Sequence, residues 1–268
     1  MTNDLQKRVI FGGIALAIFL PFLLKGGMVF QFFVGLLAII ATAELIKMHR
    51  LAPNSIEGVL AMLASLVLTL PLQNYLTFLP TDGNYTAYAI VIFLLLGSTV
   101  FNVGRYHYSD VVFPIASSFY VGISFHSLIL ARMDGLNKVF FALCIVWATD
   151  IGAYLVGRKI GRRRLLPKVS PNKTIEGFVG GILSAVVVAL IFLLLDKSLL
   201  TGYSLGMMLG FVAIFSVFSQ FGDLVESALK RHFGVKDSGK VIPGHGGILD
   251  RFDGMIFVFP IMHFFGLF

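Results

Sequence analysis

The sequence is poor in charge, in tryptophan and in cysteine. Charged residues make up 13% of its 268 residues, against about 25% in soluble domains, and 57% of the chain is hydrophobic. This apolar excess is too large for a soluble core, so the composition indicates an integral membrane protein. The single cysteine, Cys144, excludes a disulfide within the chain. The net charge of +7 suits loops facing anionic lipid, and we expect no nucleic-acid partner.

Long apolar stretches run through most of the chain, and a helix needs about 20 mainly apolar residues to cross a bilayer. We therefore expect an all-α, polytopic membrane protein with about nine transmembrane helices. The candidate spans are residues 8–25, 28–47, 57–79, 86–103, 111–131, 138–157, 174–196, 203–224 and 254–268. Pro71 is expected to end or kink the third. Residues 1–135 form a scaffold half in this interpretation, and residues 136–268 form a catalytic half with polar loops 158–173 and 225–253.

The lysines and arginines predict which side of the membrane each loop faces. If the N-terminus lies inside and nine spans alternate, 17 of the 21 basic residues fall in inner loops. The outer loops then hold only Lys25, Arg132, Lys138 and Lys197. Cytoplasmic loops are rich in basic residues, so we expect a cytoplasmic N-terminus. Both long polar loops would face the cytoplasm, where nucleotides and Mg²⁺ are available, in a protein of the plasma membrane.

Four aspartates from three expected spans can converge near the cytoplasmic face. Asp150 lies within the sixth span, Asp223 ends the eighth, and Asp250 and Asp253 stand where the ninth begins. An ionised group in a span is costly, so it normally has a partner and a function. Mg²⁺ prefers carboxylate oxygens, usually one or two together with substrate phosphates. These aspartates are candidate metal ligands, although Asp250 could instead cap a helix, and Asp150 could pair with Arg158 or another cation.

Basic residues, the usual ligands of phosphate, lie among these acids. Lys230 follows Asp223 on the same helical face, with Glu226 and Ser227 between them. An ordinary juxtamembrane belt of positive charge explains Lys240 but not Lys230, which sits among acids. The same reasoning applies to Arg251.

Glycines are concentrated at two places in the second half. Pro243-Gly244-His245-Gly246-Gly247 has three glycines in five residues, so its backbone can approach a ligand closely. A plain tight turn is the alternative interpretation, and His245 could be a general base, a phosphate donor or a structural hydrogen bonder. Gly177, Gly180 and Gly181 most simply allow close helix packing.

The other polar loop contains the segment Ser170-Pro171-Asn172-Lys173-Thr174. Pro171 after Ser170 is typical of the N1 and N-cap positions, so we expect the seventh helix to begin here. Lys173 and Thr174 would then lie in its first turn, where free N–H groups and the helix dipole favour phosphate. The arginine run 162–164 is more typical of a belt against lipid headgroups.

Three motifs of the second half share one resemblance. The longest is Ser227-x-x-Lys230-Arg231-x₄-Lys236-Asp237-x₅-Pro243-x-His245-Gly246-Gly247-x-x-Asp250-Arg251-x-Asp253. The others are Ser170-Pro171-Asn172-Lys173-Thr174-x-Glu176-Gly177 and Phe221-Gly222-Asp223. They resemble the motifs of the phosphatidate cytidylyltransferases, the CDP-diacylglycerol synthases. The match covers residues 145–260, and its longest motif is highly specific.

The resemblance implies transfer of the cytidylyl group of CTP to phosphatidic acid, giving CDP-diacylglycerol and pyrophosphate in phospholipid biosynthesis. It also implies a homodimer. The expected catalytic residues are Asp223, Lys230, Asp250, Arg251 and Asp253. The expected substrate-binding residues are Ser170, Asn172, Lys173, Thr174, Ser227, Arg231, Lys236, His245, Gly246 and Gly247. The expected ligands of Mg²⁺, and of a monovalent cation such as K⁺, are Asp223, Asp250 and Asp253, with Asp150 as a further candidate.

This reaction suits the residues, because its nucleophile is a phosphatidate oxygen that is already anionic near neutral pH. Metal and basic side chains would then act by charge neutralisation and positioning, and His245 would not be needed as a strong base. Two other functions stay open at this point. One is a CTP-dependent enzyme with another lipid acceptor, such as a polyprenol kinase, and the other is a membrane transporter.

Overall fold

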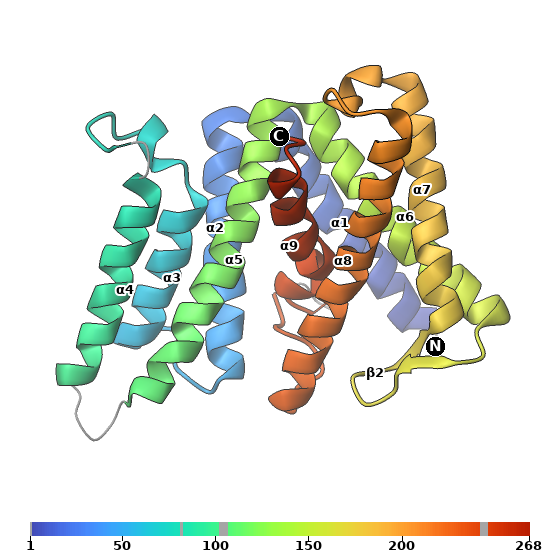
Figure 1. Cartoon of the computed structure of the whole chain (residues 1–268). Helices are drawn as coiled ribbons and strands as arrows, with labels where there is room; N and C mark the ends of the chain where they lie inside the picture. The colour runs from blue at the N-terminus through green and yellow to red at the C-terminus, as the bar shows by residue number, and fades with distance from the viewer. Residues whose placement is uncertain (1, 81–82, 102–106, 242–245) are drawn as a thin grey trace. The chain divides into compact units, whose positions relative to one another are not determined.

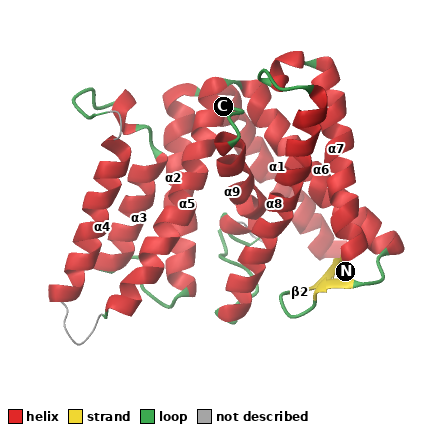
Figure 2. Cartoon of the chain, viewed as in Figure 1, coloured by secondary structure: helices red, strands yellow, loops and turns green. Residues whose placement is uncertain are grey.

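The computed structural model describes residues 2–80, 83–101, 107–241 and 246–268. Helices make up nearly all the regular structure in these ranges, so the all-α prediction is confirmed (Figure 1). The α helices are α1 (Thr2–Lys25), α2 (Gly27–Met48), α3 (Ile56–Thr69), α4 (Gly83–Phe101), α5 (Tyr108–Asp134), α6 (Leu136–Ile160), α7 (Ile175–Leu195), α8 (Leu205–His232) and α9 (Leu249–Phe264). Strands β1 (Arg164–Leu166) and β2 (Ser170–Thr174) form a small antiparallel hairpin, yellow in Figure 2.

Six of the described helices are long and apolar enough to cross a bilayer, which identifies a polytopic membrane protein. They are α2, α4, α5, α6, α7 and α8. The apolar part of α1 (Phe11–Lys25) and α3 are shorter. The total of nine crossings and the cytoplasmic N-terminus stay predictions.

Several helix ends differ from the expected ones. Helix α3 ends at Thr69, where residues 57–79 were expected to form one span, because Pro71 cannot continue the hydrogen-bond ladder. Short 3₁₀ helix η1 (Leu72–Asn74) follows it. Helix α8 continues to His232, so the first part of the expected loop 225–253 is helical. Helix α9 already begins at Leu249.

The chain packs as two compact units. Unit 1 comprises residues 1–129 and 235–251, and unit 2 comprises residues 130–234 and 252–268. Within unit 1, helices α2, α3 and α4 pack side by side (Figure 1), around an apolar cluster of Ile46, Ala61, Leu95 and Val111. The boundary proposed between a scaffold half, 1–135, and a catalytic half, 136–268, stays a prediction.

Unit 2 is built on the close contact of α6 with α7 (Figure 1). Glycines make this approach possible, as expected from their spacing. A Cβ atom added to Gly177 would lie 2.7 Å from the Ala153 carbonyl oxygen, and one on Gly180 would lie 2.5 Å from Val156 Cβ. Both distances are too short for a side chain. The contact fixes the position of Thr174, just before α7, against α6.

Candidate active site

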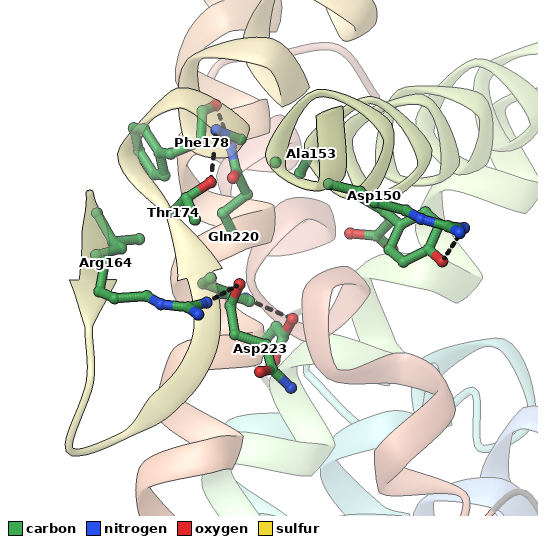
Figure 3. A pocket seen from close by; sticks show the side chains of 14 residues that line it. Asp150, Ala153, Arg164, Thr174, Phe178, Gln220 and Asp223 are labelled. Carbon is green, nitrogen blue, oxygen red and sulfur yellow. Dashed lines mark hydrogen bonds and ion pairs between the residues drawn. The ribbon is translucent and has the colours of Figure 1, made fainter. Parts of the chain in front are cut away.

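A cavity of about 470 Å³ opens in unit 2, where α6, the β hairpin, α7 and α8 meet (Figure 3). Acidic, basic and amide side chains all line it, together with glycine and aromatic surfaces. Asp150 and Asp223 contribute the carboxylates, and Arg158, Arg164 and Lys173 contribute the positive charges. A cavity of this size, with a few convergent polar groups, is typical of a small-molecule site.

Three carboxylates from three helices lie close together here. Asp150 comes from α6, Asp223 from α8 and Asp253 from α9, and the charge of each acts on at least one of the others. Asp253 does not line the cavity wall itself. The Asp253 backbone packs directly on Gly222, where an added Cβ atom would overlap the Asp253 carbonyl oxygen. Gly222 therefore lets α8 and α9 approach closely beside Asp223.

Basic side chains balance these carboxylates. Lys173 Nζ on β2 lies 2.5 Å from Asp223 Oδ2, and the Ser227 hydroxyl donates a 3.3 Å hydrogen bond to Asp223 Oδ1. One turn further along α8, Lys230 pairs with the buried Glu226 at 3.3 Å. Lys173 and Lys230 also act electrostatically on Asp253. Like-charged carboxylates in one place are thereby stabilised by two lysines.

The β hairpin replaces the helix start that was expected at Ser170 and Pro171, and that prediction is wrong. Residues 170–174 are extended and pair with β1, so Lys173 and Thr174 precede α7 and do not form its first turn. Thr174 is the N-cap, and its Oγ1 accepts a 3.1 Å hydrogen bond from the Gly177 N–H. The Arg162 N–H donates to Glu176 at 3.0 Å, which ties the hairpin to α7.

The structure brings some predicted site residues to the cavity and leaves others outside it. Asp150, Asn172, Lys173, Thr174 and Asp223 line it. Five other residues of unit 2 that were expected to act at the site do not line it, namely Ser170, Ser227, Lys230, Arg231 and Asp253. The Arg231 Nε–H donates to the Val169 carbonyl at 3.4 Å instead.

Unit 1 holds the other predicted residues. Asp250 Oδ2 accepts 2.8 Å hydrogen bonds from the Ser238 N–H, the Ser238 hydroxyl and the Gly247 N–H. Gly246 adopts a φ of 83°, a conformation that favours glycine. Lys236 and Arg251 are exposed. His245 lies outside the described residues.

Several cavity residues were not foreseen. Arg164 belongs to a run interpreted as a lipid-facing belt, yet it lines the cavity and its Nη1 donates to the Asn172 carbonyl at 3.4 Å. Gln220 on α8 is buried, and its Nε2 donates to the Phe178 carbonyl at 3.1 Å. Arg158 Nη1 donates a 3.2 Å hydrogen bond to the Tyr154 hydroxyl, and within the described part of the chain it forms no ion pair with Asp150. A glutamine within an apolar span is a sequence signal that could have marked Gln220.

The carboxylates in and beside the cavity fit a hard divalent cation. Asp150, Asp223 and Asp253 supply carboxylate oxygens, the ligands that Mg²⁺ prefers. Among the residues that the structure describes, no three acidic, histidine or cysteine side chains form a ready-made metal cage. Such a cage is not required, because Mg²⁺ is usually held by one or two carboxylates together with substrate phosphates.

A family model for the cytidylyltransferase family matches residues 6–268. The chain belongs to this family. Among its relatives, a phosphatidate cytidylyltransferase from Staphylococcus saprophyticus is 43% identical over 260 residues, which covers 97% of this chain and 98% of the relative. Phosphatidate cytidylyltransferases from Staphylococcus epidermidis and Staphylococcus aureus are each 42% identical, with the same coverage. The similarity of this cytidylyltransferase to its relatives thus includes both units, and the resemblance seen in the motifs is confirmed.

Proposed function

We propose that this cytidylyltransferase transfers the cytidylyl group of CTP to phosphatidic acid, giving CDP-diacylglycerol and pyrophosphate. The observation that carries this proposal is the 43% identity, over 97% of the chain, to a relative named phosphatidate cytidylyltransferase. The cavity supports it, because carboxylates and basic side chains meet there in a membrane protein.

In this reaction a phosphatidate oxygen attacks the α-phosphorus of CTP. A new P–O bond forms, the bond from the α-phosphorus to the bridging oxygen breaks, and pyrophosphate leaves with the electron pair. The nucleophile is already anionic, so the main obstacle is the repulsion between two anions. Lys173 and Arg164, which line the cavity, would bind phosphate oxygens and reduce that repulsion.

Mg²⁺ dependence is part of the proposal. Asp223 and Asp253 would hold the cation, with Asp150 beside them, and a bound Mg²⁺ would supply charge neutralisation at the phosphates. By the family resemblance, Asp250 would orient ligands or hold a second, monovalent cation such as K⁺. Lys173 now neutralises Asp223, and we expect it to exchange this carboxylate for a phosphate oxygen when CTP binds.

The location of the site and the oligomeric state are also part of the proposal. The basic residues near the hairpin favour a site at the cytoplasmic side of the plasma membrane, since loops on that side are rich in Lys and Arg. A homodimer is proposed from the family resemblance alone.

The test is a transfer assay with purified protein, phosphatidic acid and Mg²⁺. CTP labelled at the α-phosphate should pass its label to lipid, and CTP labelled at the γ-phosphate should not. A kinase would give the opposite result, with the γ-label in the lipid. Polyprenol in place of phosphatidic acid serves as the control acceptor. Absence of α-label in lipid, with protein that remains folded, would contradict the proposed function.

A further inference from the structure

Glu44 is a buried carboxylate in an apolar helix, and the proposed reaction does not use it. It lies near the end of α2 and is 4% exposed. No described basic side chain pairs with it. A charge in such a place needs other partners, because burial of an isolated carboxylate is costly.

The partners of Glu44 lie about two hundred residues later in the chain, in the same unit. Oε1 accepts a 2.9 Å hydrogen bond from the Ile248 N–H, and Oε2 accepts a 3.0 Å hydrogen bond from the Leu249 N–H. These N–H groups stand at the start of α9, where backbone donors lack partners within the helix. Glu44 therefore takes the role of an N-cap, supplied by another helix, and its charge suits the positive end of the helix dipole.

Described residues on the N-terminal side of α9 also surround the Glu44 carboxylate. The Ser238 hydroxyl lies 3.1 Å from Glu44 Oε2 and 2.8 Å from Asp250 Oδ2, so it links the two acids. Gly239 and Gly247 pack so tightly on the carboxylate that a Cβ atom at either would overlap it. Residues 238–239 and residues 247–249 thus contact the same side chain.

We infer that Glu44 is a positioning residue for the end of the longest motif. It fixes the first turn of α9 and with it Asp250 and Arg251. This inference rests on the proposed function and on the family resemblance, which assigns both residues to the transfer. Glu44 has no role as a ligand of the reacting groups. Its effect on the rate comes from geometry, since a small displacement of a catalytic group can cost about 100-fold.

Two substitutions test separately the charge of Glu44 and the length of its side chain. Glu44→Gln keeps the shape but replaces one acceptor oxygen by a donor, and Glu44→Asp keeps the charge but shortens the side chain. We expect each to lower kcat by about 10- to 100-fold, while KM for phosphatidic acid stays within about twofold, because Lys173 and Arg164, the residues proposed to bind phosphate, are unchanged. Glu57→Gln is the matched control, a buried glutamate on α3 in the same unit, and should keep wild-type kcat.

Hydrogen–deuterium exchange gives a readout that does not depend on activity. In Glu44→Gln, exchange should rise at Ile248 or Leu249, because one of their two N–H groups loses its acceptor, and should stay unchanged in α3. Wild-type kcat together with unchanged exchange would overturn the inference. Faster exchange throughout unit 1 would overturn it as well, because Glu44 would then stabilise the fold in general. If the wild-type protein forms no liponucleotide, the proposed function fails, but the exchange result still decides whether Glu44 holds the start of α9.

Discussion

Lys173 Nζ lies 2.5 Å from Asp223 Oδ2, so strand β2 and helix α8 are joined by an ion pair in the wall of the cavity. The lysine has 25% of its side chain exposed and the aspartate 34%, which leaves both accessible from the cavity. A partly exposed ion pair contributes little to stability, with a median of about 0–1 kcal/mol. The pair can therefore open at small cost, and its two members can take a phosphate and a cation separately.

The first prediction concerns Asp223. Asp223→Asn keeps the size of the side chain but removes the charge that would hold a cation and balance Lys173. We expect turnover to fall by at least about 100-fold, since groups that stabilise charge in the transition state contribute this much. The measurement is transfer of α-label from CTP to lipid. Asp196→Asn is the control, because Asp196 caps the 3₁₀ helix η2 (Lys197–Leu200), is absent from the cavity and should leave turnover near wild type.

A second prediction distinguishes two neighbouring arginines. Arg164 lines the cavity, whereas Arg162 does not. If Arg164 binds a phosphate of CTP, Arg164→Ala should raise KM for CTP by about tenfold, the loss expected for one charge-assisted hydrogen bond. Arg162→Ala should leave KM for CTP unchanged, because Arg162 contacts Glu176 through its backbone N–H, which alanine keeps. If the two substitutions change KM for CTP equally, Arg164 makes no specific phosphate contact and belongs, like Arg162, to the membrane surface.

The hairpin also shows why the sequence did not predict this part of the site. Ser170-Pro171 satisfies the local rule for a helix start as well as Thr174 does, and only Thr174 caps α7. Residues 170–174 pair with β1, and this pairing makes Thr174 the residue that caps the helix. No local sequence pattern predicts this contact between two segments. Arg164 reaches the cavity for the same reason, since its place in β1 sets the direction of its side chain.

Other parts were predictable because their physical cause is local. Apolar length identified most helices, and their position within or beside apolar spans singled out Asp150 and Asp223, which line one cavity. Glu44 carried the same signal, an acidic residue in a span, but its partners Ile248 and Leu249 are too distant in the chain to be inferred. A local signal thus identifies the special residue, and only the fold identifies what it contacts.

The third prediction tests the contact of α6 with α7 through glycine. Gly180→Ala places a Cβ atom 2.5 Å from Val156 Cβ, so we expect a loss of about 1–3 kcal/mol of stability from overpacking. Gly210→Ala on α8 is the control, because nothing lies within 4 Å of its added Cβ. Alanine favours helix by up to about 1 kcal/mol over glycine, so this variant should be as stable as the wild type or more so. Thermal unfolding in detergent compares the two.

The fourth prediction concerns the metal. Chelation with EDTA should abolish transfer, and added Mg²⁺ should restore it, because the carboxylates beside the cavity need a cation to approach a triphosphate. Restoration should be lost in Asp223→Asn even at high Mg²⁺ concentration. Full activity of the wild-type protein in excess EDTA would exclude a divalent ion from the reaction and leave charge neutralisation to Lys173 and Arg164.

The last prediction tests the orientation of the cytoplasmic face through a single helix. Lys168, between β1 and β2, and Lys197, after α7, are exposed at opposite ends of α7. Its 21 residues extend about 30 Å, the thickness of the hydrocarbon core. In a background of Cys144→Ser, Lys168→Cys should react with a membrane-impermeant maleimide only after the cells are permeabilised. Lys197→Cys should react in intact cells. Since one span separates the two positions, labelling of both from outside would contradict a crossing by α7, and the reverse pattern would place the cavity on the outer face.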